Sequence, residues 1–278
     1  MTRSSGSSRT PSRRVILRAL IAVPAAAILF LALAGPWLTA AQPGRIVGRP
    51  YAGPGGGFLL CTDAQGRDVW VRLLTGGRPL VLVPVIAVAL AAIFGTALGL
   101  LAGYLGGAVD AVISRLDGLL LAIPPVLVLL LVLQGWGYNP ITLIVVVVLT
   151  GTPFVSRVVR AETRRLIRSG YVEQAIGLGE GTFAILTREI LPNVVRPVLA
   201  DAGTRLALAV SITAAAGFLG FGPDTPNWGA MVGQNLEGIT LAPWGVVAPA
   251  VLLALLAVYA NRAVDRLAAR IGRTGGAS

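Results

Sequence analysis

Long apolar runs, separated by shorter polar stretches that carry arginine, are the main pattern along this chain. A helix needs about 20 apolar residues to cross the roughly 30 Å hydrocarbon core of a bilayer. Six runs of that kind cover residues 15–37, 79–104, 116–134, 141–159, 198–219 and 244–260. The pattern predicts an all-α polytopic membrane protein with six transmembrane helices, the third of which is interrupted by Pro124 and Pro125.

Arginine is distributed unevenly between the segments that join these runs. If the N-terminus is cytoplasmic, seventeen arginines fall in inside segments, and only Arg45, Arg49, Arg67, Arg72 and Arg78 fall outside. The positive-inside rule then places both termini in the cytoplasm. We expect a disordered cytoplasmic tail over 1–14 and a transmembrane domain over 15–278. Within that domain, 38–78 is expected to be extracytoplasmic and 157–197 a cytoplasmic loop.

The first forty residues also permit a second interpretation. Ser12, Arg13 and Arg14 precede an apolar run that ends near Thr39, as in a twin-arginine signal peptide. Cleavage of that run would leave five spans, an odd number, while the C-terminal segment would still carry its arginines. The positive-inside distribution therefore favours a retained first span.

Composition excludes several chemistries. The chain is 55% hydrophobic and 13% charged, with a formal net charge of +11 that comes from arginine without any lysine. A P-loop needs lysine, which is absent, and the lack of histidine excludes imidazole acid–base catalysis and histidine metal ligands. The single cysteine, Cys61, allows no internal disulfide. Because the arginines flank apolar runs, a nucleic-acid interface is not expected either. The function classes that remain are transport, scaffolding and an enzyme that uses carboxylates.

Two of the predicted spans carry small residues at every fourth position on one face. They are Ala91, Gly95, Gly99 and Gly103 in the second span, and Ala207, Ser211 and Ala215 in the fifth. Small residues at this spacing let two helix backbones approach closely. We expect close packing at both faces, with sliding during gating as the alternative.

The loop over 157–197 contains seven arginines and four glutamates, yet it is amphipathic. Its apolar residues include Ala175, Ile176, Phe183, Ile185 and Leu186. They are spread over two short helical stretches, and Gly177 and Gly179 are available for the turn between them. An apolar helix face of this kind predicts insertion into a groove of a partner protein.

Residues 171–179 read Tyr-Val-Glu-Gln-Ala-Ile-Gly-Leu-Gly, and Leu191-Pro192 follows downstream. This spacing resembles the cytoplasmic coupling loop of ABC importer permeases, which docks on an ATPase. The resemblance implies that coupling to the ATPase involves Glu173, Gln174, Ala175, Gly179, Phe183, Leu191 and Pro192. Two positions depart from the family pattern, because Gln174 replaces an alanine and Glu189 replaces an apolar residue or histidine.

Two more segments, 62–78 and 218–231, resemble the dipeptide, oligopeptide and nickel subfamily of these permeases, and its dipeptide-transport C-type members in particular. The resemblance implies a type I importer permease fold in the bacterial cytoplasmic membrane. It implies a non-catalytic subunit without cofactor or metal, with ATP and Mg²⁺ on partner subunits. The partners would be a homologous permease, cytoplasmic ABC ATPase domains and an extracytoplasmic substrate-binding protein.

Charged residues of the outer segment stand four apart in two pairs, Asp63 with Arg67 and Asp68 with Arg72. This spacing predicts ion pairs on a short outer helix. Their charges would face water or contact the binding protein. Asp201 and Arg205 have the same spacing and are expected to neutralise each other.

Aromatic residues mark the outer loop after the fifth span, among them Phe221 and Trp228. Aromatic rings favour the membrane interface, which predicts anchoring there. A contribution to gating or to receiving substrate is the alternative.

Import of di- or oligopeptides is the function that the resemblance implies, and nickel or another small solute is the alternative. The lack of histidine and the single cysteine favour peptides over a metal. An ion-driven secondary transporter is the rival from another class. It predicts inverted repeats and a carboxylate deep in a span, and neither is evident in this sequence.

Overall fold

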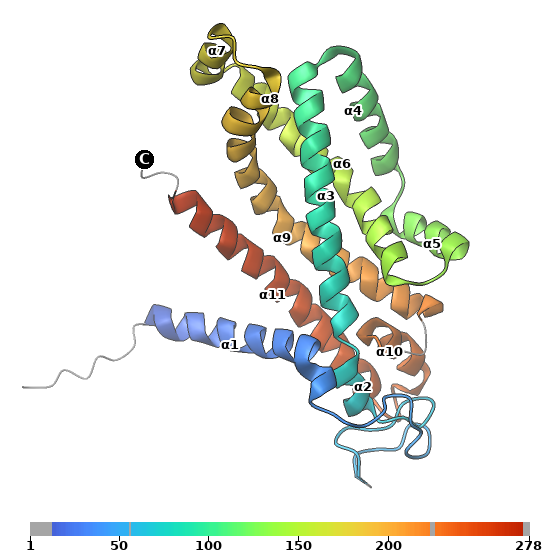
Figure 1. Ribbon diagram of the computed structural model, residues 1–278. Helices are drawn as coiled ribbons and strands as arrows, with labels where there is room; N and C mark the ends of the chain where they lie inside the picture. The colour runs from blue at the N-terminus through green and yellow to red at the C-terminus, as the bar shows by residue number, and fades with distance from the viewer. Residues whose placement is uncertain (1–12, 56, 223–225, 275–278) are drawn as a thin grey trace, which may run out of the picture.

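Helices make up nearly all of the regular structure in Figure 1. The computed structural model describes residues 13–55, 57–222 and 226–274, with side chains between residues 23 and 264 of these ranges. The longer helices are α1 (Arg13–Ala34), α3 (Arg78–Leu105), α4 (Gly107–Ala122), α5 (Pro125–Trp136), α6 (Pro140–Ile167), α9 (Leu191–Ala216) and α11 (Trp244–Thr274). Shorter ones are α2 (Val69–Thr75), α7 (Gly170–Gly177), α8 (Thr182–Ala184) and α10 (Trp228–Asn235). Residues 1–12 of the expected tail over 1–14 lie outside the described residues. Its last two residues belong to α1, which begins at Arg13.

Four continuous helical segments in the described part of the chain are long and apolar enough to cross a membrane. They contain α3, α6, α9 and α11, and they match four of the predicted spans. The pair α4 and α5 counts as a fifth only if a bent span is allowed. The first predicted span forms α1, which extends sideways from the foot of the bundle and touches α3 and α11 near its C-terminal end (Figure 1).

The third predicted span is divided between α4 and α5, which confirms the predicted interruption at Pro124 and Pro125. The axes of α4 and α5 meet at 87°. Ile123 and Pro124 between them have extended backbone, with ψ of 123° and 133°. A residue that precedes proline is disfavoured in the helical region, and two consecutive prolines place two such residues in a row. The apolar composition of 116–134 was evident in the sequence, but the Pro-Pro step turns the chain.

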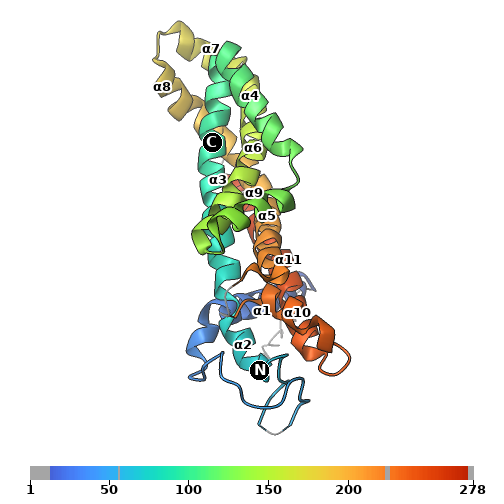
Figure 2. The same cartoon turned by 90° about the vertical axis from the view of Figure 1, so that its right-hand side faces the viewer.

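Helices α3 and α6 lie side by side along most of their length in both views (Figures 1 and 2). A Cβ built on Gly95, Gly99 or Gly103 would fall 2.6 Å from the nearest atoms of α6, including Cβ of Val155 and Cβ of Val159. No side chain fits at that separation, so the glycines set the distance between the two helices. The close packing predicted for this face of the second span is confirmed.

Replacing Gly99 by alanine is expected to destabilise the bundle by about 1–3 kcal/mol, the usual cost of overpacking a filled interior. The new methyl group would meet the Ser156 carbonyl oxygen and the Val159 side chain, which stand on a packed helix and cannot retreat. Thermal unfolding of the detergent-solubilised protein measures the change. Gly118→Ala on α4 is the matched control, since its Cβ would meet only the end of a flexible arginine at 3.9 Å. Equal midpoints for the two variants would contradict the expected close packing.

The small-residue face of the fifth predicted span behaves differently. Ser211 on α9 is exposed, and Ser211 and Ala215 line two open grooves instead of a helix seam. The close packing predicted for this face is therefore not made among the residues that the structure describes.

Candidate functional site

The inner loop, residues 168–190, lies at one end of the molecule and joins two long helices. Helix α6 continues beyond the predicted span as far as Ile167, so the expected loop over 157–197 begins in structure as a helix. After it come α7, α8 and a short π-helical turn over Ile185–Ile190, and α9 starts at Leu191. The two short helical stretches predicted here are confirmed, and they lie at the same end of the molecule as the turn between α3 and α4 (Figure 1).

Gly179 ends α7 in a left-handed conformation, with φ of +78°. The N–H of Glu180 donates to the Ala175 carbonyl at 3.1 Å, and the N–H of Gly179 donates to the Ile176 carbonyl at 3.0 Å. These two bonds form a Schellman motif, whose left-handed position favours glycine. The predicted use of Gly179 for the turn between the two stretches is confirmed.

The two faces of α7 have different surroundings. Val172 and Ala175 are buried in a cluster with Leu166, Ile185 and Ile190, which fixes α7 to the ends of α6 and α9. Four other large side chains of the inner loop are exposed. They are Tyr171, Ile176, Leu178 and Phe183, and Phe183 is 79% exposed. These four exposed side chains, named here the loop patch, have no cover within the described chain.

Of the other residues predicted for coupling, some are exposed and some are buried. Glu173 and Gln174 are exposed on α7, where Glu173 stands in the first turn, a position favourable for an acidic side chain. Ala175 is buried and holds α7 in place. Leu191 is half-buried, and Pro192 is exposed in the first turn of α9.

An ionic cluster close to the inner loop was not predicted from the sequence. Asp110 in the first turn of α4 pairs with Arg160 and Arg164 of α6, at 2.7 Å from Arg160 Nη2 and 2.5 Å from Arg164 Nη2. It ties α4 to the part of α6 that leads into α7. Because the partners lie fifty or more positions apart in sequence, local spacing gave no signal for them.

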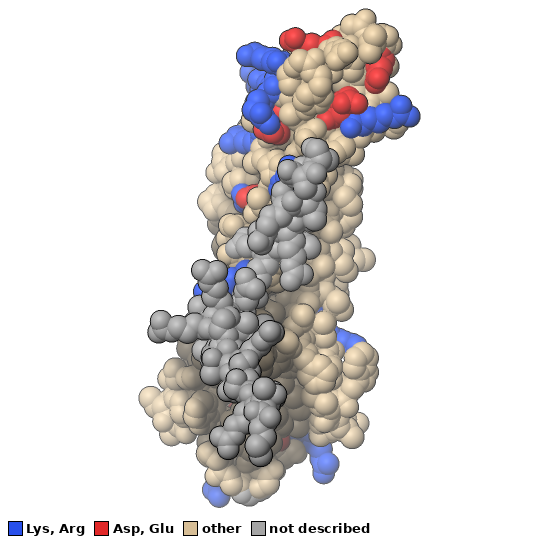
Figure 3. Space-filling view, turned by 90° about the vertical axis from the view of Figure 1, so that its left-hand side faces the viewer, with Lys and Arg blue, Asp and Glu red and all other residues tan. Residues whose placement is uncertain are grey.

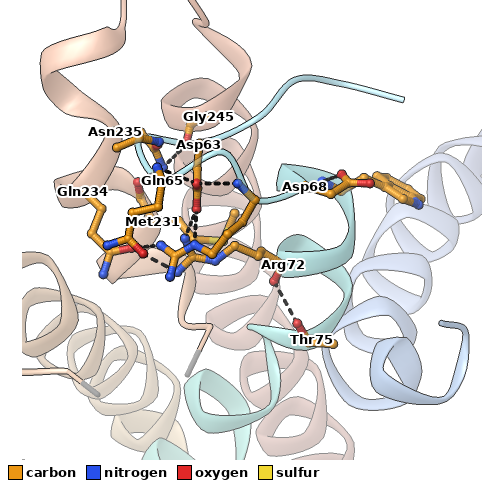
Figure 4. Close-up of polar contacts among 12 residues, drawn as sticks. Asp63, Gln65, Asp68, Arg72, Thr75, Met231, Gln234, Asn235 and Gly245 are labelled. Atoms are coloured by element: carbon orange, nitrogen blue, oxygen red, sulfur yellow. Dashed lines mark hydrogen bonds and ion pairs between the residues drawn. The ribbon is translucent and has the colours of Figure 1, made fainter. Parts of the chain in front are cut away.

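Asp63 is the centre of a buried polar network at the opposite end of the molecule (Figure 4). Its carboxylate accepts from Arg67 Nε at 2.7 Å and also from Arg72 Nη1. Its other oxygen accepts the backbone N–H groups of Gln65 and Arg67. Gln234 of α10 accepts from both guanidinium groups, at 3.3 and 3.0 Å. The network therefore joins the outer segment, residues 38–68, to α2 and α10.

The predicted outer helix with water-facing charges is wrong in two respects. Asp63 does pair with Arg67, but in a turn before the helix and fully shielded from water. Asp68 caps α2, accepting the N–H of Trp70 at 2.8 Å, and Arg72 donates to Asp63 and Gln234. A carboxylate with two arginines and a nearby glutamine satisfies more donors than an isolated i,i+4 pair could.

The aromatic residues of the outer loop differ in burial, since Phe218 is exposed and Trp228 is not. Trp228 is completely buried, and its indole N–H donates to the Leu73 carbonyl at 2.8 Å. The prediction that Trp228 anchors the loop at a membrane interface is wrong, because its ring is buried against α2. Phe221 is half-buried beside Tyr138.

Acidification is expected to loosen the outer segment. Burial alone raises the pKa of Asp63, but the hydrogen bonds from Arg67 and the charge of Arg72 outweigh it and hold that pKa below its ordinary value. The carboxylate therefore contributes stability that is complete above about pH 4, the ordinary value, and is lost as the pH falls through the lower pKa of the folded protein.

Cys61 supplies the readout for this prediction, because it is buried beside the network and is the chain's single thiol. Its modification by 4,4′-dithiodipyridine, relative to the denatured protein at each pH, is expected to accelerate only below pH 4. Asp63→Asn is expected to react equally fast above and below that pH. A wild-type rate that stays flat down to pH 2 would contradict the stabilising effect of the charged carboxylate.

Charged side chains of both signs gather at the end of the molecule that holds the inner loop, at the top of Figure 3, and a mostly uncharged surface lies below them. Exposed Arg45 and Arg49 belong to the outer segment at the far end. Apolar helices with exposed aliphatic side chains, capped by charged ends, define a helical integral membrane protein.

Comparison with known proteins places the chain more closely. Residues 95–273 match the family described as binding-protein-dependent transport system inner membrane component, and the chain belongs to that family. It is 32% identical over 217 residues to the glutathione transport system permease protein GsiD of Pectobacterium atrosepticum, covering 77% of this chain and 72% of the relative. It is also 32% identical over 242 residues to the di/tripeptide transport system permease protein DppC of Pseudomonas aeruginosa, covering 83% and 80%.

Solved structures share the fold. A chain of the MetNI methionine ABC transporter, described in inward-facing conformations, superposes with a TM-score of 0.53 at 19% identity. The match covers 69% of this chain and 93% of the other. The sequence resemblance to ABC importer permeases is thus confirmed at the level of family and fold.

Proposed function

We propose that this chain is a permease subunit of an ATP-driven importer of short peptides. The relatives named above carry glutathione or di- and tripeptides in their names, which supports this substrate class. The subunit would form the path with a homologous permease, and receive substrate from an extracytoplasmic binding protein. Cytoplasmic ATPase subunits would hold the ATP and Mg²⁺.

Six spans with both termini in the cytoplasm complete the proposal. Helix α1 would be the first span, and the bent pair α4–α5 the third. The arginine-rich end of α6 supports a cytoplasmic inner loop, by the positive-inside rule. The outer segment would then face the binding protein.

The loop patch is the observation on which the coupling function rests. Four exposed apolar side chains on two short helices at the arginine-rich end suit a groove of a partner protein. Glu173 and Gln174 beside them supply polar contacts at the edge of such an interface. Ala175, Gly179 and Leu191 would act indirectly, by holding the helices that present this patch.

Phe183→Asp tests this proposal in the complex purified after co-expression with the flanking genes. A charge at the most exposed ring of the patch is expected to weaken ATPase binding by about 30-fold, the scale of an interface hot spot. ATPase co-purification on a tag placed on this chain, and ATPase stimulation by binding protein with alanyl-alanine, are the measurements.

Leu59→Asp is the matched control, because Leu59 is an equally exposed apolar side chain in the outer segment. It is expected to retain the ATPase. If Phe183→Asp keeps a fully stimulated ATPase, the loop patch is not the coupling surface. If Ni²⁺ stimulates the wild-type complex and no peptide does, the metal alternative replaces peptide import.

A further inference from the structure

An apolar groove lies at mid-height between α3, α6 and α9, beside the start of α5 (Figure 1). Its volume is about 370 Å³. Small-molecule pockets run from about 300 to 1,000 Å³, so a groove of this size suits a ligand of two or three residues. Val88, Val126, Val147 and Leu208 are among its apolar lining residues.

Only three of the lining side chains are polar, and two of these direct their hydrogen bonds to their own helices. Thr150 donates to the Val146 carbonyl at 2.8 Å, and Ser211 donates to the Ala207 carbonyl at 3.0 Å. The third is Arg205, which lines the groove from α9. Polar recognition of a ligand in this groove therefore depends on a guanidinium group.

Arg205 is fixed on two sides. Its guanidinium carbon lies 4.0 Å from the centroid of the Phe154 ring, in a cation–π contact. Nε and Nη2 donate to the two oxygens of Asp201, at 2.7 and 3.2 Å, which confirms the pair predicted from the sequence. Nη1 donates to no group of the described residues, so part of the five-donor fork remains available.

We propose that this groove receives the peptide in transit, and that Arg205 binds its terminal carboxylate. The inference rests on the function proposed above. Guanidinium and carboxylate match in geometry and charge, and an apolar surrounding strengthens their contact. Apolar side chains of the peptide lie along the valine and leucine surface of the groove.

Asp201 explains how a charged contact can serve transport instead of trapping the substrate. A site on a translocation path must bind well enough to admit the ligand and weakly enough to release it. Asp201 competes for the same guanidinium and lowers the net charge of the site. Phe154 keeps the Arg205 guanidinium in position while the peptide carboxylate and the Asp201 carboxylate exchange on it. Arg205 sets specificity, and Asp201 and Phe154 position it.

Thiol protection tests the site without depending on selection by the binding protein. Leu208 is half-exposed in the groove, and Cys61, the native thiol, is buried. In Leu208→Cys, within the assembled complex in lipid nanodiscs, the introduced thiol is labelled with N-ethylmaleimide. Millimolar alanyl-alanine is expected to slow labelling, whereas its C-terminal amide is expected to have little effect.

Variants in the same background give the direction of the effect. Arg205→Gln is expected to raise the alanyl-alanine concentration needed for protection by about tenfold, the effect of one charge-assisted hydrogen bond. Arg205→Lys is expected to fall between, and Asp201→Asn to lower that concentration. Opposite signs at Arg205 and Asp201 separate recognition from loss of folding.

Equal protection by the acid and the amide would overturn this inference, as would protection that does not respond to Arg205→Gln. So would an absence of protection in a complex whose ATPase is stimulated by alanyl-alanine with binding protein. Failure of the proposed function has a different appearance. In that case no peptide stimulates the wild-type ATPase at all.

Discussion

Asp63→Ala is expected to destabilise the outer end of the protein by about 3–5 kcal/mol, because it leaves buried cationic side chains without their carboxylate. Arg67 and Arg72 are 4% and 0% exposed, so water cannot replace the lost partner. Gln234 accepts from both guanidinium groups, but its neutral oxygen does not replace the negative charge of the carboxylate. Reversible unfolding in detergent, with Cys61 labelling as the local readout, measures the loss.

Asp68→Ala is the matched control, five positions along the chain. It removes a helix cap and is expected to cost about 1 kcal/mol. A similar loss for both variants would mean that the network around Asp63 adds nothing beyond a local turn.

Gly179→Val is expected to reduce coupled uptake by about tenfold. A non-glycine residue in the left-handed region costs about 1–2 kcal/mol, and a β-branched one is among the least tolerant. Helix α7 is only eight residues long and depends on its end and on its packing for stability. Uptake of radiolabelled alanyl-alanine by proteoliposomes containing the complex and binding protein is the measurement.

Gly179→Asn separates backbone conformation from side-chain bulk. Asparagine adopts the left-handed conformation readily, and a Cβ here meets no atom within 4 Å. It is therefore expected to keep most of the uptake. Equal losses in the two variants would indicate that any side chain at this position obstructs the partner, and that the left-handed turn is not the reason for glycine.

Local patterns in the sequence predicted the features that depend on local physics. Apolar run length identified α3, α6, α9 and α11, because crossing a bilayer requires helix and length alone. The Gly177–Gly179 turn was predictable for the same reason, since a helix end needs its left-handed residue within the same few positions.

Features set by distant partners could not be predicted in this way. Four-residue spacing suggested that Asp68 pairs with Arg72, but Gln234 and Asp63 bind Arg72 in the folded chain. The sequence suggested an interfacial ring for Trp228, but in the folded chain its indole N–H donates to the Leu73 carbonyl of α2. For Asp201 and Arg205 the spacing did suffice, because both stand on one continuous helix.

The glycine contacts between α3 and α6 have a mechanical consequence. Two rods that cannot slide past one another bend as a single beam, and the stiffness of a beam rises steeply with its thickness. Val155, Val159 and Thr163, set against glycines of α3, block such sliding along the half of α6 that leads to the inner loop. Pro153, which interrupts the hydrogen bonds of α6, stands at the outer limit of this stiff section and directly before Phe154. A force applied at α7 would therefore reach the level of Phe154 with little lost to flexing on the way.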